Sequence, residues 1–345
     1  MRNYLDLLQN ILDNGETKSD RTGVDTKSIF GTTLRFSIYE GFPIITTRQM
    51  PVLSILSELL WFISGSSNIN DLKKIYAKNK FWDGNYADYI KRNNYEDDGD
   101  CGKLYGKQWR KWEFIEKEEA NFVETEIYKH EIDQLQNVID TIKKNPNDRR
   151  ILVTAWNPAE VSSDKCALPP CHVLIQLYCS KMNNFDKLIY LNNNSPVLYD
   201  DIMKVLKIDV ESSTGMFEES TKLDQILSKI EIPELKLSLQ WYQRSVDSFL
   251  GLCSNISSYA FLLSILAKLT NTVPHELIFV GGDTHIYLNH IDIVKEQLQR
   301  IPYQIPKSKL KIKDRGQTKL EDFVMTDFEL ENYQFHPKLT AEMAV

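Results

Sequence analysis

The sequence lacks the features that define several protein classes. Its five cysteines are odd in number and form no C-x-x-C pair, so we expect neither a disulfide framework nor a zinc site, and a reducing cytoplasm is the expected location. No uninterrupted apolar run reaches the roughly eighteen residues of a membrane-spanning helix. A P-loop, a G-x-G-x-x-G turn after a strand and an H-E-x-x-H helix are also absent. The net charge of −7 excludes a generic nucleic-acid surface, although a few arginines can still form an anion pocket.

The 345 residues suffice for one large domain or two ordinary ones. Apolar periodicity predicts helices at 4–12, 54–64, 133–144 and 256–270, and strands at 28–31, 34–38, 151–156, 173–178 and 235–245. Two segments interrupt this pattern. The charge-rich segment at about 113–130 and the segment 181–234, which mixes charge with short helical patterns, are both interpreted as surface insertions.

The strongest candidate for chemistry is Cys171, in the run A-L-P-P-C-H at 167–172. Two prolines hold the backbone extended before it, so that the cysteine is presented at the start of a strand. A thiolate is a nucleophile, and it needs nearby positive charge or a base to form at neutral pH. Arg149, Arg150 and Arg244 are candidate sources of that charge. The alternative interpretation is a buried structural cysteine.

Glu58 is a carboxylate within the apolar helix expected at 54–64. Burial would raise its pKa and allow it to carry a proton near neutral pH. A position on the one solvated face of the helix is the alternative, and the sequence leaves both open. Arg149 and Arg150 precede an apolar strand and point to opposite sides of it, so they suit an anion site or a subunit interface.

Three further groups of residues have both a binding and a structural interpretation. The aromatic turns F-W-D-G-N at 81–85 and Y-G-K-Q-W-R at 105–110 could wall a flat ligand or belong to the core. His285 and Tyr287 share one strand face and could both hydrogen-bond a sugar hydroxyl, or form a core pair. Arg21, in the turn S-D-R-T-G, could belong to an anion loop or be a solvated surface residue.

Together these segments resemble the thymidylate synthase family over nearly the whole chain, apart from the two interrupting segments. Many separate motifs occur in the order typical of that family. They are D-R-T-G at 20–23, E-L-L-W-F at 58–62, Y-G-x-Q-W-R at 105–110, D-R-R at 148–150, L-P-P-C-H at 168–172, Q-R-S-x-D at 243–247, N-I-x-S-Y at 255–259, G-D-x-H-I-Y-L-N-H at 282–290 and M-A-V at 343–345.

The resemblance implies an α/β (α+β) fold: a large, bent, mixed β-sheet flanked by helices, in a single domain of residues 1–345, with a sheet face that forms a homodimer interface. It implies dUMP as substrate and 5,10-methylenetetrahydrofolate as one-carbon donor, with no metal, no membrane and no required nucleic acid. Cys171 would add to C6 of the pyrimidine, and C5 would then attack the methylene carbon. After the folate leaves, hydride from tetrahydrofolate gives dTMP and dihydrofolate, whereas water gives 5-hydroxymethyl-dUMP.

The resemblance also assigns roles to single residues. Catalytic roles fall to Cys171, Glu58, Tyr105 and Asp247. Substrate binding falls to Arg21, Arg244, Ser245, Asn255, His285 and Tyr287, and to Arg149 and Arg150 across the dimer interface. Folate binding falls to Trp82, Asn85, Asp247, Gly251, Ser254 and the carboxylate of Val345. Asn255 suits uracil because an amide both donates and accepts, and the cytosine-using members of the family carry Asp there.

Two departures from the family pattern bear on the product. The segment that ordinarily reads Gly-x-Pro-Phe-Asn reads G-L-C-S-N at 251–255, and loss of the aromatic wall forfeits about 1–3 kcal/mol of contact and leaves room for water. Gln49 replaces the second basic residue that usually follows the Thr-Thr pair. We therefore expect a deoxyuridylate hydroxymethylase, with thymidylate synthase as the alternative and an inactive homologue that acts as a binding module as the third. The 181–234 insertion suggests a specialised, viral member.

Overall fold

The structure is a computed structural model that describes residues 1–19, 23–120, 124–162, 164–210, 216–303 and 307–342. Its helices are α1 (Arg2–Asn14), α2 (Val52–Ile63), α3 (Ile69–Ile75), α4 (Asp83–Asn93), α5 (Tyr105–Arg110), α6 (Gln134–Lys144), α7 (Asn184–Asn194), α8 (Pro196–Val210), α9 (Met216–Leu227), α10 (Gly251–Thr270) and α11 (Ile291–Leu298). Its strands are β1 (Glu16–Lys18), β2 (Thr26–Ser37), β3 (Trp112–Ala120), β4 (Glu124–Ile132), β5 (Leu152–Thr154), β6 (His172–Lys181), β7 (Leu235–Asp247), β8 (Val273–Tyr287), β9 (Lys309–Ile312) and β10 (Phe328–Glu331).

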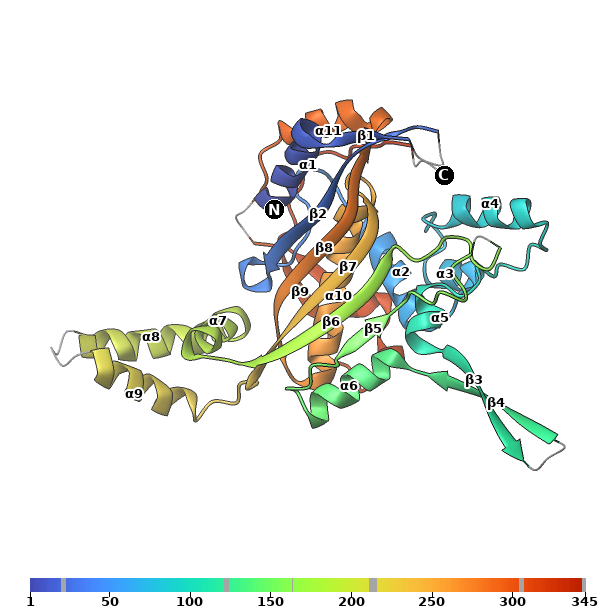
Figure 1. Ribbon diagram of the computed structural model, residues 1–345. Coiled ribbons are helices and arrows are strands. Elements are labelled where there is room, and N and C mark those ends of the chain that lie inside the picture. The colour runs from blue at the N-terminus through green and yellow to red at the C-terminus, as the bar shows by residue number, and fades with distance from the viewer. Residues whose placement is uncertain (20–22, 121–123, 163, 211–215, 304–306, 343–345) are drawn as a thin grey trace.

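A six-stranded sheet forms the centre of the molecule (Figure 1). The strand order is β1-β2-β8-β7-β6-β5, in which β7 and β8 run parallel and all other neighbours run antiparallel. The long connection from β7 to β8 contains α10, as a parallel pair requires. This mixed sheet with its flanking helices confirms the fold class that the sequence predicts.

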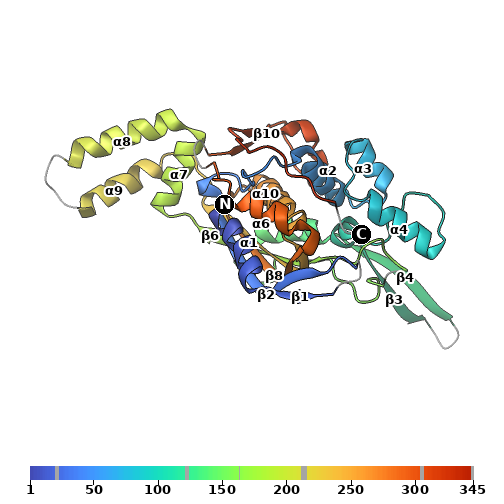
Figure 2. The same cartoon turned by 90° about the horizontal axis from the view of Figure 1, so that it is seen from above.

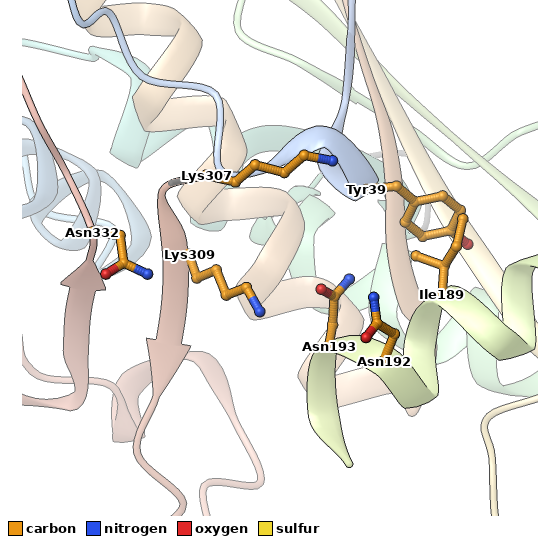
Figure 3. Close-up of a pocket in the computed structure, with 7 residues that line it drawn as sticks. All are labelled: Tyr39, Ile189, Asn192, Asn193, Lys307, Lys309 and Asn332. Atoms are coloured by element: carbon orange, nitrogen blue, oxygen red, sulfur yellow. The ribbon is translucent and has the colours of Figure 1, made fainter. Parts of the chain in front are cut away.

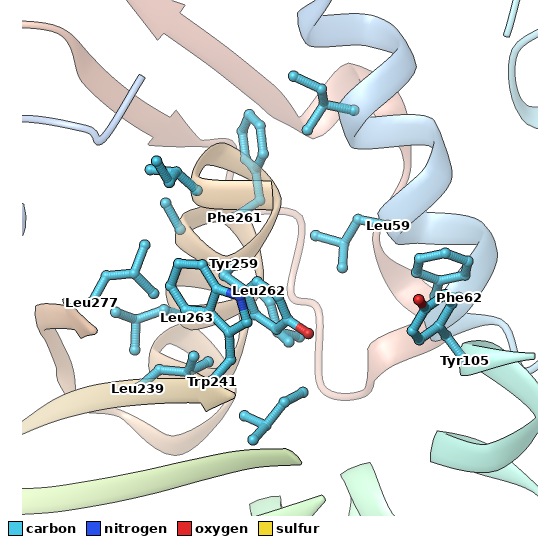
Figure 4. Packing of buried hydrophobic residues seen from close by; sticks show 14 of the residues in the cluster. Leu59, Phe62, Tyr105, Leu239, Trp241, Tyr259, Phe261, Leu262, Leu263 and Leu277 are labelled. Carbon is cyan, nitrogen blue, oxygen red and sulfur yellow. The ribbon is translucent and has the colours of Figure 1, made fainter. Parts of the chain in front are cut away.

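Helix α10 is the centre of the core and packs behind the sheet (Figure 1). It is long and apolar enough to cross a membrane, but 72% of its most apolar window is buried inside the fold, as expected of a core helix. Tyr259 on α10 stacks on Trp241 of β7 with ring centroids 4.7 Å apart (Figure 4). Because α10 begins at Gly251, just after β7 ends, its first turn lies beside the end of that strand.

The opposite face of the sheet faces the viewer in Figure 1 and carries no helix there. Strand β6 alternates strictly: Ile175 and Leu177 are buried, whereas Leu174 and Tyr178 are exposed, Tyr178 to 68%. Exposed apolar side chains on an open sheet face are typical of an interaction surface. They are compatible with the expected homodimer interface, which stays a prediction.

One local expectation differs from the structure, and one expected surface segment proves to contain paired strands. The runs at 28–31 and 34–38 are one strand, β2, because Gly31 adopts a positive φ of 80° and the pairing with β8 continues past it. The charge-rich segment at 113–130 is the paired hairpin β3–β4, which projects from the body of the molecule (Figure 1). Glu113 fixes the base of this hairpin, because its carboxylate lies 3.1 Å from Lys103 and 2.9 Å from Lys129.

The segment between β6 and β7 forms helices α7, α8 and α9, which extend away from the sheet (Figure 2). They share a small apolar cluster of their own around Leu191. A buried ion pair, Lys236–Asp186 at 2.7 Å, ties α7 to β7. A cavity of about 480 Å³ separates α7 from the C-terminal strands, and Lys307 and Lys309 line it (Figure 3). The extent of the insertion, 181–234, stays a prediction.

The close approach of α5 to α2 predicts that Gly106→Ala destabilises the fold. A Cβ at Gly106 would lie 2.8 Å from the carbonyl oxygens of Phe62 and Ser66, so we expect a loss of about 1–3 kcal/mol in the free energy of unfolding. Gly251→Ala is the matched control, because its Cβ would meet no atom closer than 3.8 Å. Denaturant titration measures both variants, and equal stabilities would contradict the prediction.

Candidate active site

Cys171 lies at the start of β6, where the strand pairs with β7. The backbone N–H of Arg244 on β7 donates to the carbonyl of Cys171 at 2.9 Å. The Nη2 atom of the same arginine lies 3.7 Å from the Cys171 sulfur. A permanent positive charge at this distance favours the thiolate over the thiol. The structure thus brings together the expected nucleophile and one of its three candidate cations.

The guanidinium of Arg244 is held by the backbone that precedes the cysteine. Its Nε donates to the Pro170 carbonyl and its Nη2 to the Pro169 carbonyl, both at 3.0 Å. Its Cζ lies 5.4 Å from the centroid of the Trp156 ring, which supports the plane of the guanidinium. The sequence did not predict this role for the two prolines, although their extended backbone is what presents both carbonyls.

Tyr105, at the start of α5, holds the same loop from the other side. Its hydroxyl oxygen accepts the backbone N–H of Cys171 at 2.8 Å. The pKa of Tyr105 lies well above its ordinary value, mainly because of burial and further because of negative charge at Cys171. The phenol is therefore neutral at physiological pH, with a proton that it can still donate.

Glu58 lies within α2 and faces α4. The indole Nε1 of Trp82 donates to its carboxylate at 2.7 Å, and Asn85 lies on the first turn of the same helix, α4. The residue is half-buried, but its apolar surroundings desolvate the carboxylate, which raises the pKa of Glu58 to about 7 against the opposing effect of the Trp82 hydrogen bond. Of the two alternatives that the sequence left open, this desolvation favours the carboxyl that exchanges a proton near neutral pH.

Asn255, on the first turns of α10, has an oriented amide. The Trp241 indole donates to Gln243 Oε1 at 3.3 Å, so the Gln243 amide nitrogen faces Asn255 and donates to its Oδ1 at 3.2 Å. Burial lowers the pKa of neighbouring His172 to about 4, while a hydrogen bond with Asn255 acts in the opposite direction. His172 is therefore neutral. The sequence assigns no role to Gln243 or His172, but each directly adjoins an assigned residue, Arg244 or Cys171, and that adjacency is the signal that could have found them.

His285 and Tyr287 lie together on β8, with ring centroids 5.2 Å apart. The His285 Nδ1 lies 3.1 Å from Asp283, whose carboxylate also lies 3.0 Å from Lys18. In the strand register, Asp247 of β7 pairs with His285. His285 and Tyr287 therefore lie at the same end of the sheet as Arg244. Ser245 is half-buried on β7 beside Arg244.

Asp247 joins the end of β7 to α10. Its Oδ1 accepts the backbone N–H groups of Phe249 and Leu250 at 2.8 and 3.2 Å, which leaves its second oxygen without a hydrogen bond among the described residues. Gly251 is the first residue of α10. The Ser254 hydroxyl donates to the Leu250 carbonyl at 3.3 Å, within its own helix. A free carboxylate oxygen suits the ring N–H groups of a pterin.

Cys253, one of the two departures in this segment, is fully buried. The guanidinium of Arg48 donates to its sulfur at 2.7 Å and lies over the Phe249 ring at 4.3 Å. Arg48 is itself only 5% exposed. Cys253 therefore belongs to the packing beneath α10, while Ser254 remains the departure that is half-buried.

Two expected site residues, Arg149 and Arg150, are not joined to this cluster, and two more cannot be placed. Arg149 and Arg150 are exposed, Arg150 to 87%, and Arg150 is paired only with nearby Asp148 at 3.2 Å in the part of the chain that the structure describes. Arg21 and Val345 lie outside the described residues. Within the described ranges, no group of three or more His, Cys, Asp or Glu side chains is arranged to hold a metal ion.

Comparison with known proteins places this geometry in context. The family model described as "Thymidylate synthase" matches residues 2–194 and 222–345. The unmatched stretch lies within the helical segment between β6 and β7. The thymidylate synthase of Enterobacteria phage T4 is 37% identical over 359 aligned positions, which cover 100% of both chains.

The hydrogen bond from Trp82 predicts the effect of Trp82→Phe on Glu58. The indole N–H stabilises the charged carboxylate, so its loss raises the pKa of Glu58 by about one pH unit from about 7. Difference infrared spectra against Glu58→Gln follow the carboxyl stretch through a pH titration. Trp109→Phe is the control, because Trp109 is buried in the same aromatic cluster without a bond to Glu58. An unchanged or lower pKa would contradict the prediction.

Proposed function

Because this chain belongs to the thymidylate synthase family, whose members are one-carbon transferases that use 5,10-methylenetetrahydrofolate, we propose that it converts dUMP to dTMP. The observation that carries this proposal is the contact between the Cys171 sulfur and Arg244 at 3.7 Å, at the mouth of β6. A thiolate next to a fixed guanidinium is a nucleophile ready for addition to an electron-poor ring.

In the first step Cys171 adds to C6 of the pyrimidine, and C5 gains the electron pair of the C5–C6 bond. Arg244 stabilises the attacking thiolate. Its Nη1 has no hydrogen bond within the described residues, so it remains free for the phosphate. Ser245, Arg21 and two arginines of a second subunit complete the proposed phosphate site.

Asn255 selects uracil in this proposal. Gln243 occupies one lone pair of the Asn255 oxygen and fixes the amide, so that its N–H₂ is directed to a ligand oxygen such as uracil O4. His285 and Tyr287 bind the deoxyribose hydroxyl. A cytosine ring offers an amino donor at position 4, which would meet another donor, and this favours dUMP over dCMP.

Glu58 transfers the proton that leaves C5. Its pKa of about 7 lets it accept and return a proton at physiological pH. Trp82, Asn85, Gly251 and the second oxygen of Asp247 form the proposed folate wall. The bound folate supplies the methylene carbon and, on oxidation to dihydrofolate, the hydride that completes the methyl group.

Three observations favour dTMP as the product. Cys253 contacts Arg48 beneath α10, so this substitution does not widen the folate side of the site. The Ser254 hydroxyl is hydrogen-bonded within its own helix and so is not committed to holding a water. The relative from phage T4 is itself named thymidylate synthase. Deoxyuridylate hydroxymethylase is the second candidate, favoured by the small polar Ser254 in place of an aromatic wall.

We also propose a homodimer built on the open sheet face, and a cytoplasmic location, which a chain whose five cysteines are not joined in disulfides supports. An inactive homologue that serves as a binding module is the third candidate. The contacts that Cys171 makes with Tyr105 and Arg244 speak against it.

Product analysis separates the first two candidates. With dUMP and methylenetetrahydrofolate, we expect dihydrofolate absorbance to grow in step with dTMP. Appearance of 5-hydroxymethyl-dUMP without dihydrofolate would establish the second candidate instead, and Ser254→Phe should then shift the product toward dTMP. Cys171→Ser should abolish turnover and the covalent adduct with 5-fluoro-dUMP, and an adduct that survived would remove Cys171 as the nucleophile.

Subunit mixing tests the shared phosphate site. Cys171→Ser and the double variant Arg149→Ala/Arg150→Ala should each be inactive or strongly impaired alone. After random exchange of subunits we expect about a quarter of the wild-type activity, since half of the dimers are mixed and each holds one complete site. Lys144→Ala, at the nearby end of α6, is the control for the double variant. If mixing restores no activity, the arginines do not cross the interface.

A further inference from the structure

Tyr259 carries a polar atom that the fold leaves unsatisfied. The residue is 2% exposed, and its hydroxyl has no hydrogen-bond partner in the part of the chain that the structure describes. Its ring is fixed between Trp241, with centroids 4.7 Å apart, and His172, with centroids 5.4 Å apart. A buried hydroxyl is nearly always satisfied by protein, ordered water or ligand, and an orphan is costly.

The hydroxyl points toward the catalytic groups. In Figure 4 its oxygen is directed from α10 toward the side of the core where Phe62 and Tyr105 lie. The Tyr105 ring is 4.9 Å from His172, so the three rings form a continuous stack that leads from α10 to α5. Burial raises the pKa of Tyr259 well above its ordinary value, and negative charge at Tyr105 and Glu58 adds to this effect.

Two neighbouring side chains, Glu58 and Tyr105, each have one polar atom or proton that makes no hydrogen bond within the described residues. Glu58 receives Trp82 on Oε1, and its Oε2 has no hydrogen bond within the described residues. Tyr105 accepts the N–H of Cys171, and its own O–H proton has no acceptor there. Together with the Tyr259 hydroxyl, they give three groups that can each form one more hydrogen bond within the same region of the core. An internal water typically makes about three hydrogen bonds, which matches this set.

We propose that Tyr259 holds an internal water between Glu58 and Tyr105, and is thereby a positioning residue for proton transfer. The inference rests on the proposed function and deepens it. When C5 loses its proton, the water accepts that proton and passes one of its own to the Glu58 carboxylate. The water is unchanged after the step, and Tyr259 neither gains nor loses a proton. Its role is to fix the oxygen of the relay.

The titratable and charged groups that face this region come from several elements. Glu58 comes from α2, Tyr105 from α5 and His172 from β6, while Cys171 and Arg244 act through Tyr105. His172 is neutral because burial lowers its pKa to about 4. Glu58 is therefore the one group in the set whose pKa, about 7, places its titration in the working pH range.

Tyr259→Phe tests the inference, because it keeps the ring stack and removes only the hydroxyl. We expect kcat to fall by about tenfold or more, with the KM for dUMP within about twofold of the wild type. The acid limb of the pH profile of kcat should move to higher pH, because the Glu58 carboxylate loses a hydrogen bond from the water. Tyr89→Phe is the control, since Tyr89 is also buried and its hydroxyl donates to the Asp164 carbonyl at 3.4 Å.

Other results of the Tyr259→Phe experiment would contradict the proposed role of Tyr259. An unchanged kcat in Tyr259→Phe, or a reduced kcat with the acid limb at its wild-type position, would overturn the inference. A high-resolution crystal structure supplies an independent readout: an ordered water should lie within about 3.2 Å of the Tyr259 oxygen in the wild type and be absent from Tyr259→Phe. If the wild type does not turn over dUMP, the proposed function fails, whereas the crystallographic water still decides whether the site exists.

Discussion

The contact between Arg244 and the loop that carries Cys171 is the interaction on which the candidate site depends. Adjacent strands supply the two residues, and the backbone hydrogen bond between them sets their register. The guanidinium then donates hydrogen bonds to the carbonyl oxygens of Pro169 and Pro170. One side chain therefore both shapes the loop and supplies the charge beside the sulfur. A lysine has no planar fork and could not do both.

Burial is the second constraint, and it gives the polar groups of the site their protonation states. The same apolar surroundings raise the pKa of Glu58 to about 7 and lower that of His172 to about 4. They also keep Tyr105 protonated. Low-dielectric surroundings thus hold three neutral or nearly neutral groups beside one fixed cation. Of these three groups, Glu58 alone has a pKa near neutrality, which supports the role in proton transfer that we propose for it.

Local patterns predicted much of this arrangement. Strand alternation predicted β6 and β7, and apolar spacing predicted α2 and α10, because each pattern reflects the face that an element buries. Contacts between distant segments could not be predicted from the sequence, because nothing in the run G-L-C-S-N indicates that Arg48 lies beneath Cys253. The hairpin β3–β4 was missed for a related reason, since its dense charge masks the strand periodicity. A site shared between subunits cannot be derived from one chain.

The helical segment α7–α9 joins β6 and β7, the two strands beside which Cys171 and Arg244 meet, but it lies at their other ends. The strand register explains this. Lys181 pairs with Leu235 at the helical end, whereas His172 pairs with Gln243 at the catalytic end. About nine residues of strand separate the two ends, which is about 30 Å. An added segment at one end changes only the connection between β6 and β7, because the ladder of hydrogen bonds fixes how Cys171 meets Arg244. The sheet therefore keeps the helical segment, which contains the stretch 195–221 that the family model does not match, at the end opposite the candidate site.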